Sequence, residues 1–165
     1  MAWKIELDIS RCCACGACAI ACMDQNDIDL STGVRPYRTV FREETRRTGE
    51  IRYYSMACMH CDNAPCVTAC PSGCLYKDPA TGLTRYDTTH CIGCHSCAMA
   101  CPYGAISLES IGLPSATSET MAQRSMRSVA VRCDLCKDWM KREGKSVPAC
   151  VEACPVHARS VVQIG

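Results

Sequence analysis

The chain has 165 residues, enough for one domain, but eighteen cysteines beside one Phe, two Trp and six Tyr exclude an ordinary hydrophobic core. The formal net charge of +1 gives no sign of a nucleic-acid or membrane-surface partner. Every apolar run falls short of the roughly 20 residues that a membrane-spanning helix needs, so we expect no membrane anchor within this sequence.

The cysteines predict an interior organised either by disulfide bridges or by metal centres. A disulfide framework needs an oxidising compartment, yet the sequence opens MAWKIELDIS, which lacks the basic and apolar regions of a secretory signal. A twin-arginine signal is not seen either. We therefore expect metal centres in a cytoplasmic protein, with export alongside a signal-bearing partner as the alternative.

From the N-terminus onward, the sequence predicts short strands that alternate with cysteine-rich loops. Ile5, Leu7 and Ile9 alternate with polar residues, which is typical of a strand. Residues 35–55 indicate a long hairpin, and residues 75–87 indicate a second hairpin around a Pro/Gly turn. These elements lead into and out of the loops described below.

The second half of the sequence repeats the pattern. The segments GCLYKD, GAISLE and ARSVVQI each follow a Cys-Pro dipeptide and favour β-structure. Residues 110–128 predict a surface loop, read as a solvated connector with a partner-docking element as the alternative. Val129 and Val131 then predict another strand. The order of strand, cysteine loop, short helix and strand indicates four half-units of a bacterial ferredoxin, or two ferredoxins.

Sixteen cysteines fall into four groups of four: Cys12, Cys15, Cys18, Cys22; Cys58, Cys61, Cys66, Cys70; Cys91, Cys94, Cys97, Cys101; and Cys133, Cys136, Cys150, Cys154. Groups one and three have the spacing CxxCxxCxxxC, and groups two and four are stretched versions of it. Three cysteines at intervals of three let a loop offer three thiolates to one iron–sulfur cubane, while the fourth ligates another cluster. Proline after groups two, three and four stops the short helix that carries the last cysteine.

Zinc is the main chemical alternative, because two CxxC-like pairs also suit a tetrahedral structural site. Group four alone fits a zinc ribbon, whereas groups one and three carry too many thiolates in one loop. Cys13 and Cys74 match no ligand position, and we interpret both as small buried residues. Other side chains near the motifs are expected to pack or hydrogen-bond beside the clusters: His60, His90, His95, His157, Met56, Met59, Met99 and Met140.

Basic residues near the cysteine groups are candidates for neutralising the clusters: Arg11, Arg132, Lys137 and Lys141. Each oxidised cubane with its thiolates carries about −2, so four would change the protein's charge from +1 to about −7. Ordinary solvated surface charge is the alternative reading.

These motifs resemble the four-cluster iron–sulfur subunits that serve molybdenum and tungsten enzymes, the family of dimethyl sulfoxide reductase and formate dehydrogenase electron-transfer subunits. The most specific stretches are CMHCDNAPCVTACPSG, CIGCHSCAMACPYGAI, and CDLC followed by GKSVPACVEACP. The resemblance implies an α+β fold with few long helices, in which one ferredoxin-like module is inserted in another. Residues 1–34 and 110–165 would form the outer module, 35–57 a hairpin insertion, and 58–109 the inner module.

The resemblance also implies crosswise ligation of four [4Fe-4S] clusters. The implied ligand sets are set A (Cys12, Cys15, Cys18, Cys154), set B (Cys133, Cys136, Cys150, Cys22), set C (Cys58, Cys61, Cys66, Cys101) and set D (Cys91, Cys94, Cys97, Cys70). In nitrate reductase relatives a Trp at the position of Cys94 accompanies a three-iron cluster, so the cysteine here implies a full cubane.

The function implied is electron relay, without catalytic residues, between a molybdopterin or tungstopterin subunit and a flavin, quinone or ferredoxin-type carrier. Because no C-terminal membrane helix is seen, the implied setting is a soluble complex of the aldehyde oxidoreductase, formate dehydrogenase, hydrogenase-linked or benzoyl-CoA reductase type. Partners would include the catalytic subunit, a flavin subunit, or further copies of this chain that extend a wire. The alternative is a free soluble polyferredoxin that shuttles between enzymes.

Overall fold

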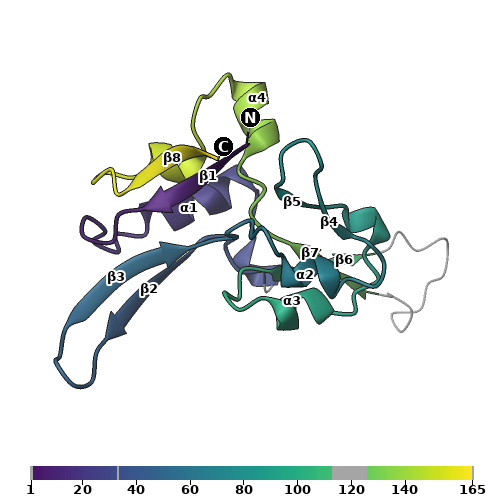
Figure 1. The fold of residues 1–165 in the computed structure, drawn as a ribbon, viewed down its shortest axis with the longest axis horizontal. Coiled ribbons are helices and arrows are strands. Elements are labelled where there is room, and N and C mark those ends of the chain that lie inside the picture. The colour runs from purple at the N-terminus through teal and green to yellow at the C-terminus, as the bar shows by residue number, and fades with distance from the viewer. Residues whose placement is uncertain (1, 33, 113–125, 165) are drawn as a thin grey trace.

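The computed structural model describes residues 2–32, 34–112 and 126–164 (Figure 1). Within these residues the strands are β1 (Ala2–Leu7), β2 (Thr39–Glu44), β3 (Ile51–Met56), β4 (Leu75–Lys77), β5 (Thr84–Tyr86), β6 (Ser107–Gly112), β7 (Met126–Val131) and β8 (Arg159–Ile164). The helices are α1 (Ala17–Gln25), α2 (Pro65–Thr68), α3 (Ser96–Ala100), α4 (Lys137–Glu143) and α5 (Ala149–Glu152). Two single 3₁₀ turns span Leu30–Thr32 and Thr88–His90. The protein is thus a small mixed fold of short strands and short helices, as a ferredoxin-like domain is.

The strands form antiparallel pairs, and the first strand pairs with the last. Ala2 of β1 lies opposite Ile164 of β8, and Leu7 lies opposite Arg159. Along β1, Trp3, Ile5 and Leu7 are half-buried. Lys4 and Glu6 between them are exposed, which is the alternation expected of a strand that covers a core on one face. The predicted strand therefore exists but ends at Leu7, and Ile9 lies beyond it, 53% exposed.

Both predicted hairpins are confirmed. Residues 35–55 contain β2 and most of β3, and residues 75–87 contain β4 and β5. The segments after the Cys-Pro dipeptides are also strands, namely β4, β6 and β8. The predicted loop over 110–128 is shorter than expected, because β6 and β7 extend into it from either side and pair with each other. The middle of that loop, residues 113–125, lies outside the described residues.

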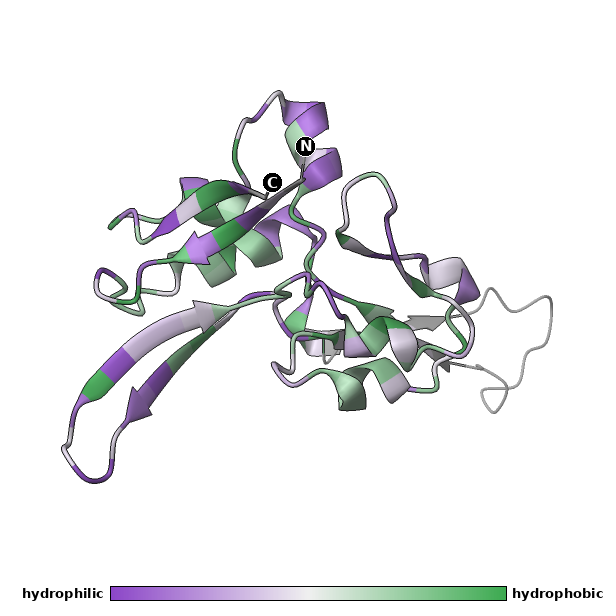
Figure 2. Ribbon diagram, viewed as in Figure 1, coloured by the Kyte–Doolittle hydropathy of each residue, from purple (hydrophilic) through white to green (hydrophobic). Residues whose placement is uncertain are grey.

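Helices α2, α3 and α5 end before the closing Cys-Pro of their groups, as a following proline favours. The closing cysteines lie just after these helices and not within them, which corrects that part of the prediction. Helix α1 has no such proline and runs through Cys22 to Gln25. Helix α4 was not predicted. It occupies the long spacer of group four, ends at Gly144 in the left-handed conformation, and is strongly hydrophilic (Figure 2).

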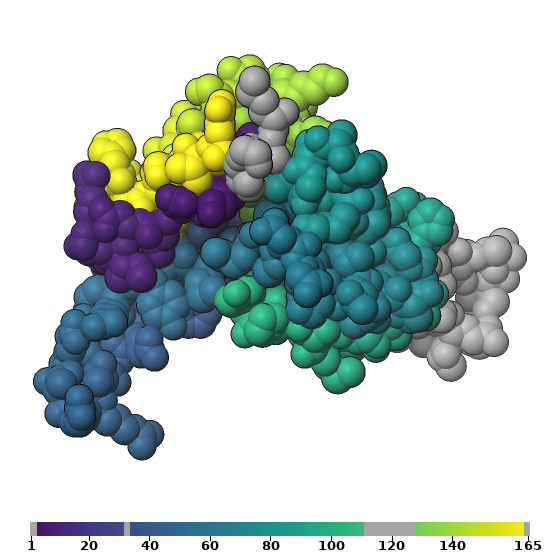
Figure 3. Space-filling view, viewed as in Figure 1, coloured from purple at the N-terminus to yellow at the C-terminus, as the bar shows by residue number. Residues whose placement is uncertain are grey.

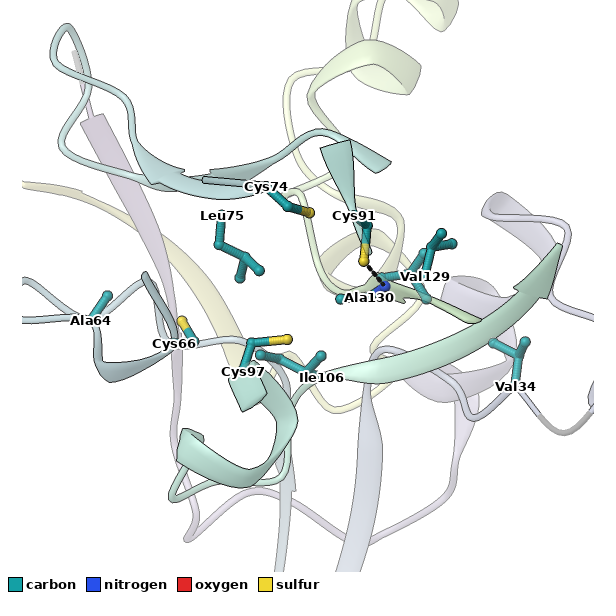
Figure 4. Close-up of a cluster of buried hydrophobic side chains, with 11 residues drawn as sticks. Val34, Ala64, Cys66, Cys74, Leu75, Cys91, Cys97, Ile106, Val129 and Ala130 are labelled. Atoms are coloured by element: carbon teal, nitrogen blue, oxygen red, sulfur yellow. Dashed lines mark hydrogen bonds between the residues drawn. The ribbon is translucent and has the colours of Figure 1, made fainter. Parts of the chain in front are cut away.

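Cysteines and small aliphatic residues make up most of the core. The larger cluster of buried side chains joins Cys66, Cys91 and Cys97 to Leu75 and Ile106, all shown in Figure 4. Three consecutive β7 residues complete it: Val129, Ala130 and Val131. The strand that leads into group four is therefore buried beside the cysteines of groups two and three.

The β2–β3 hairpin projects from the rest of the molecule as an arm (Figures 1 and 3). Phe41 and Tyr54 stack across it with ring centroids 5.2 Å apart. Toward its tip the residues are exposed, and Arg52 pairs with Glu50 at 3.2 Å on the surface. In the part of the chain that is described, no helix has the length and apolar character needed to cross a membrane.

Candidate metal centres

Four cysteines of set C line a single cavity of about 350 Å³, which includes space open to solvent. Three of them come from the loop around α2, and Cys101 comes from the end of α3. Helices α2 and α3 pack against each other, and this contact brings the two groups together. Arg132, just after β7, lines the same cavity.

Two further cavities, each of about 300 Å³, hold sets D and B. One is lined by Cys91, Cys94, Cys97 and Cys70, with the surplus Cys74 beside them. The other is lined by Cys133, Cys136, Cys150 and Cys22. In each case three cysteines come from one group and the fourth from another.

For set A, the structure shows only that the helices carrying or preceding two of its cysteines pack together, and no cavity seen in the described residues is lined by all four. Cys18 lies in α1, Cys154 follows α5, and these two helices pack against each other. Cys18 and Cys154 are buried, Cys12 is partly buried and Cys15 is exposed.

The loops that present the cysteines contain residues with positive φ. Three residues after the closing cysteine of groups two, three and four, the chain takes this conformation at Gly73, Gly104 and His157. The turn aims a later amide at the cysteine sulfur: Ala105 donates to Cys101 Sγ at 3.4 Å, and Ala158 donates to Cys154 Sγ at 3.3 Å. Amide donors aimed at sulfur stabilise a thiolate, which is the ligand form of cysteine. This repeated turn was not predicted, although the segments PSG and PYG contain its glycine.

Arg132 is 1% exposed and is the buried cation of the set C cavity. Its Nη1 donates to Cys58 Sγ at 3.1 Å and lies 4.0 Å from Cys66 Sγ. Among the described residues, its Nε and Nη2 have no hydrogen-bond partner. A buried guanidinium without a carboxylate is costly, so this cavity suits an anionic occupant. Thiolates together with a cluster supply that negative charge.

A second buried polar centre forms around Ser55, at the base of the hairpin arm. Arg38 donates to Ser55 Oγ at 3.3 Å, Arg159 donates to the same oxygen, and Cys18 Sγ lies 3.7 Å from it. Burial lowers the pKa of Arg38, but nearby Cys150, Cys133 and Cys18 outweigh that effect and raise it. Arg38 therefore lies close to cysteines of both set A and set B.

The thiols of set B are strongly desolvated. Burial raises the pKa of Cys22 to about 11, with Cys150 adding to the effect and Arg38 opposing it. Burial also raises the pKa of Cys136 to about 12, and that of Cys133 above its ordinary value. Free thiols here would stay protonated at neutral pH, so binding a metal centre would release protons.

Two expectations about neighbouring residues were wrong. Met59 and Met99 do not fill space in the interior, because they are 49% and 81% exposed. Cys13 is exposed rather than buried, whereas Cys74 is 1% exposed as expected.

His60 is buried, and burial lowers its pKa to about 4, so it is neutral near pH 7. Of the four basic residues predicted to neutralise clusters, Arg132 alone contacts a cysteine sulfur among the interactions seen in the described residues.

We expect the Cys13→Ala variant to keep its full iron content, because the exposed Cys13 side chain matches no ligand position. Iron analysis of anaerobically purified protein measures this. The neighbouring Cys12→Ala variant is the control and should lose iron. Loss of iron from Cys13→Ala with full iron in Cys12→Ala would mean that Cys13, not Cys12, belongs to set A.

Comparison with known proteins places these cysteines in a wider group. The model of the 4Fe-4S dicluster domain matches residues 49–164. The chain is 34% identical over 159 residues to a Rhodospirillum rubrum iron-sulfur protein, covering 93% of this chain and 78% of the relative. It is 35% identical to Protein NrfC of Escherichia coli, covering 92% of this chain and 60% of NrfC. It is 32% identical to the thiosulfate reductase electron transfer subunit PhsB of Salmonella typhi, covering 92% and 70%.

Proposed function

This chain belongs to the 4Fe-4S dicluster domain family, and from that premise we propose that it relays electrons through four [4Fe-4S] clusters within a larger oxidoreductase complex. The coarser role, an iron–sulfur electron-transfer subunit of a reductase or dehydrogenase, follows from its relatives. The proposal adds the number of clusters, the ligand sets A to D, and a molybdenum or tungsten catalytic partner.

The observation that carries the proposal is that the cysteines of sets B, C and D each line one cavity. Each cavity combines three cysteines of one group with the closing cysteine of another, as crosswise ligation requires. Amide hydrogen bonds to sulfur and buried guanidinium groups add the positive potential that thiolate-bound clusters need.

A bound [4Fe-4S] cluster supplies one-electron redox chemistry over a wide range of potentials. The chain's own residues then have three tasks. The cysteines fix the position of each centre, the buried core limits access of water, and the arginines and amides adjust the local potential. Proton transfer by side chains is not needed, and we propose no catalytic residue.

Partner contact is supported by large exposed apolar side chains that lie within the cysteine groups or next to them: Ile20, Met59, Ile92, Met99 and Tyr103. Large apolar side chains left exposed beside the ligands favour a surface that a partner covers. A partner subunit covering these loops would place its own redox centre near the clusters.

We propose a two-module organisation in which β7 is buried with the inner module, although it leads into group four.

We expect protein purified without oxygen from its native host to contain about sixteen irons per chain, four for each of four clusters. Its visible absorbance should bleach on reduction, because the clusters take up electrons. Iron and acid-labile sulfide analysis, combined with reductive titration, measures both. A colourless protein that contains zinc would contradict the proposal and support the zinc alternative.

The same preparation separates the relay from a free polyferredoxin. A relay subunit is expected to copurify with a molybdenum- or tungsten-containing chain at constant stoichiometry. An 18 kDa monomer that carries all its iron and has no stable partner would support the shuttle instead.

A further inference from the structure

The cavities of sets C and D differ in charge, although their cysteine spacing is similar. Arg132 lines the set C cavity, where its side chain donates to Cys58 Sγ at 3.1 Å. Among the residues that the structure describes, those that line the set D cavity include no arginine, lysine, aspartate or glutamate. Lys77 adds positive charge on the set C side, where its Nζ donates to the Cys61 carbonyl oxygen at 2.5 Å.

Two neighbouring residues, Ala130 and Arg132, each supply a hydrogen-bond donor to one of the two cavities. The Ala130 amide at the end of β7 donates to Cys91 Sγ of set D at 3.5 Å (Figure 4). Two residues later, the Arg132 guanidinium donates to Cys58 of set C. Set D thus receives a neutral dipole and set C a full positive charge. Charge-assisted hydrogen bonds are roughly twice as strong as neutral ones.

The Arg132 charge is held in place. Its side chain is 1% exposed, lies near the Tyr86 ring at 6.0 Å, and has no carboxylate among the hydrogen-bond and ion-pair partners seen in the described residues. Water therefore screens it little, and none of the ion pairs seen in residues 2–32, 34–112 and 126–164 includes it. Its positive potential falls on the sulfurs of Cys58 and Cys66, which would carry the electron density of a reduced centre. A fixed cation stabilises the reduced, more negative form and raises the reduction potential.

We propose that Arg132 makes the set C centre the higher-potential member of the pair that it forms with the set D centre. The inference rests on the proposed function, because it requires both centres to be present. An electron that reaches the inner module then resides on the set C centre in preference to the set D centre. The two centres of the inner module then differ in reduction potential, so they form an ordered step in the relay and are not equivalent sites.

The test is a redox titration of the purified holoprotein, followed by electron paramagnetic resonance. Cys61→Ser and Cys94→Ser alter one ligand each of sets C and D, and so identify the two signals. In the unaltered protein, the centre identified by Cys61→Ser is expected to have the higher midpoint potential. This measurement needs no change at Arg132, so a folding defect in an arginine variant leaves it intact.

Arg132→Gln is then expected to make one-electron reduction of the set C centre at least tenfold less favourable. This corresponds to a midpoint potential lower by about 59 mV. The midpoint potential of the set D centre should stay nearly unchanged. Arg132→Lys keeps the charge and should move it less. The matched control is Arg85→Gln, which removes an equal charge from a side chain that binds the Asp134 carbonyl and Asp78 instead of sulfur.

A set C potential at or below that of set D in the unaltered protein would overturn the inference. So would an Arg132→Gln variant that keeps the set C potential, or an Arg85→Gln variant that shifts it equally. Failure of the proposed function looks different, because iron analysis of the unaltered protein would then find fewer than about sixteen irons before any potential is measured.

Discussion

Replacing Cys22 with alanine is expected to lower the iron content of the purified protein by about a quarter, from about sixteen irons to about twelve. Cys22 lines the cavity of set B together with three cysteines of group four, so its loss should open that centre and leave the others intact. Alanine is preferred to serine because a serine oxygen can still bind iron. The measurement is iron analysis with integration of the paramagnetic signals after reduction.

Double variants decide between crosswise and local ligation. Under crosswise ligation, Cys22→Ala with Cys150→Ala removes the same single cluster, so the double variant loses no more iron than either single variant. Cys22→Ala with Cys18→Ala would remove two clusters and about half the iron. Under local ligation within group one, these two outcomes are exchanged, and the proposed sets A and B would be wrong.

Gly93→Ala is expected to be the most destabilising single substitution in a cysteine loop outside the ligands. Gly93 has φ of +72°, and a Cβ atom there would lie 2.8 Å from the Ser128 carbonyl oxygen, a backbone atom of β7 that cannot easily move. The left-handed conformation and the clash together should lower the free energy of unfolding by about 2–4 kcal/mol. For a chain of this size, that corresponds to a thermal midpoint lower by about 5–15 °C.

Gly16→Ala is the matched control for this prediction. Gly16 also lies in a cysteine loop and has φ of +81°, but no atom lies within 4 Å of the Cβ position. The Gly16→Ala variant should lose only what the left-handed conformation costs an alanine, about 1 kcal/mol of unfolding free energy. This corresponds to a thermal midpoint lower by about 2–4 °C. Thermal melts of the two loaded variants provide the comparison. Equal losses would show that the close approach to Ser128 has no energetic weight.

Much of the local structure followed from residue patterns. Alternation at Ile5 and Leu7 marked β1, the Pro/Gly turn between Leu75 and Tyr86 marked a hairpin, and proline after Cys101 marked the end of α3. These features are local, since each depends on a few neighbouring residues. The family resemblance added the crosswise sets, which no local pattern contains.

The sequence did not predict the features that depend on distant partners. The pairing of β6 with β7 places Val129 in the core with Cys91, and nothing near either residue specifies that contact. Arg132 was one of four candidate cations, and only its burial against Cys58 separates it from the others. Cys13 looked like a buried small residue but is exposed, and no local pattern in the sequence distinguishes it from the buried Cys74.

The pairing of β1 with β8 has a consequence for biosynthesis. During translation, residues 58–101 leave the ribosome with every cysteine of the proposed sets C and D, while Cys150 and Cys154 are not yet made. Strand β1 must wait for β8, a partner more than a hundred residues away, which is a slow kind of contact to form. If the proposed set A is right, Cys12, Cys15 and Cys18 spend that interval without their fourth ligand. Cluster delivery to the newborn chain would then proceed from the middle outward, with the centres of the proposed sets A and B filled last.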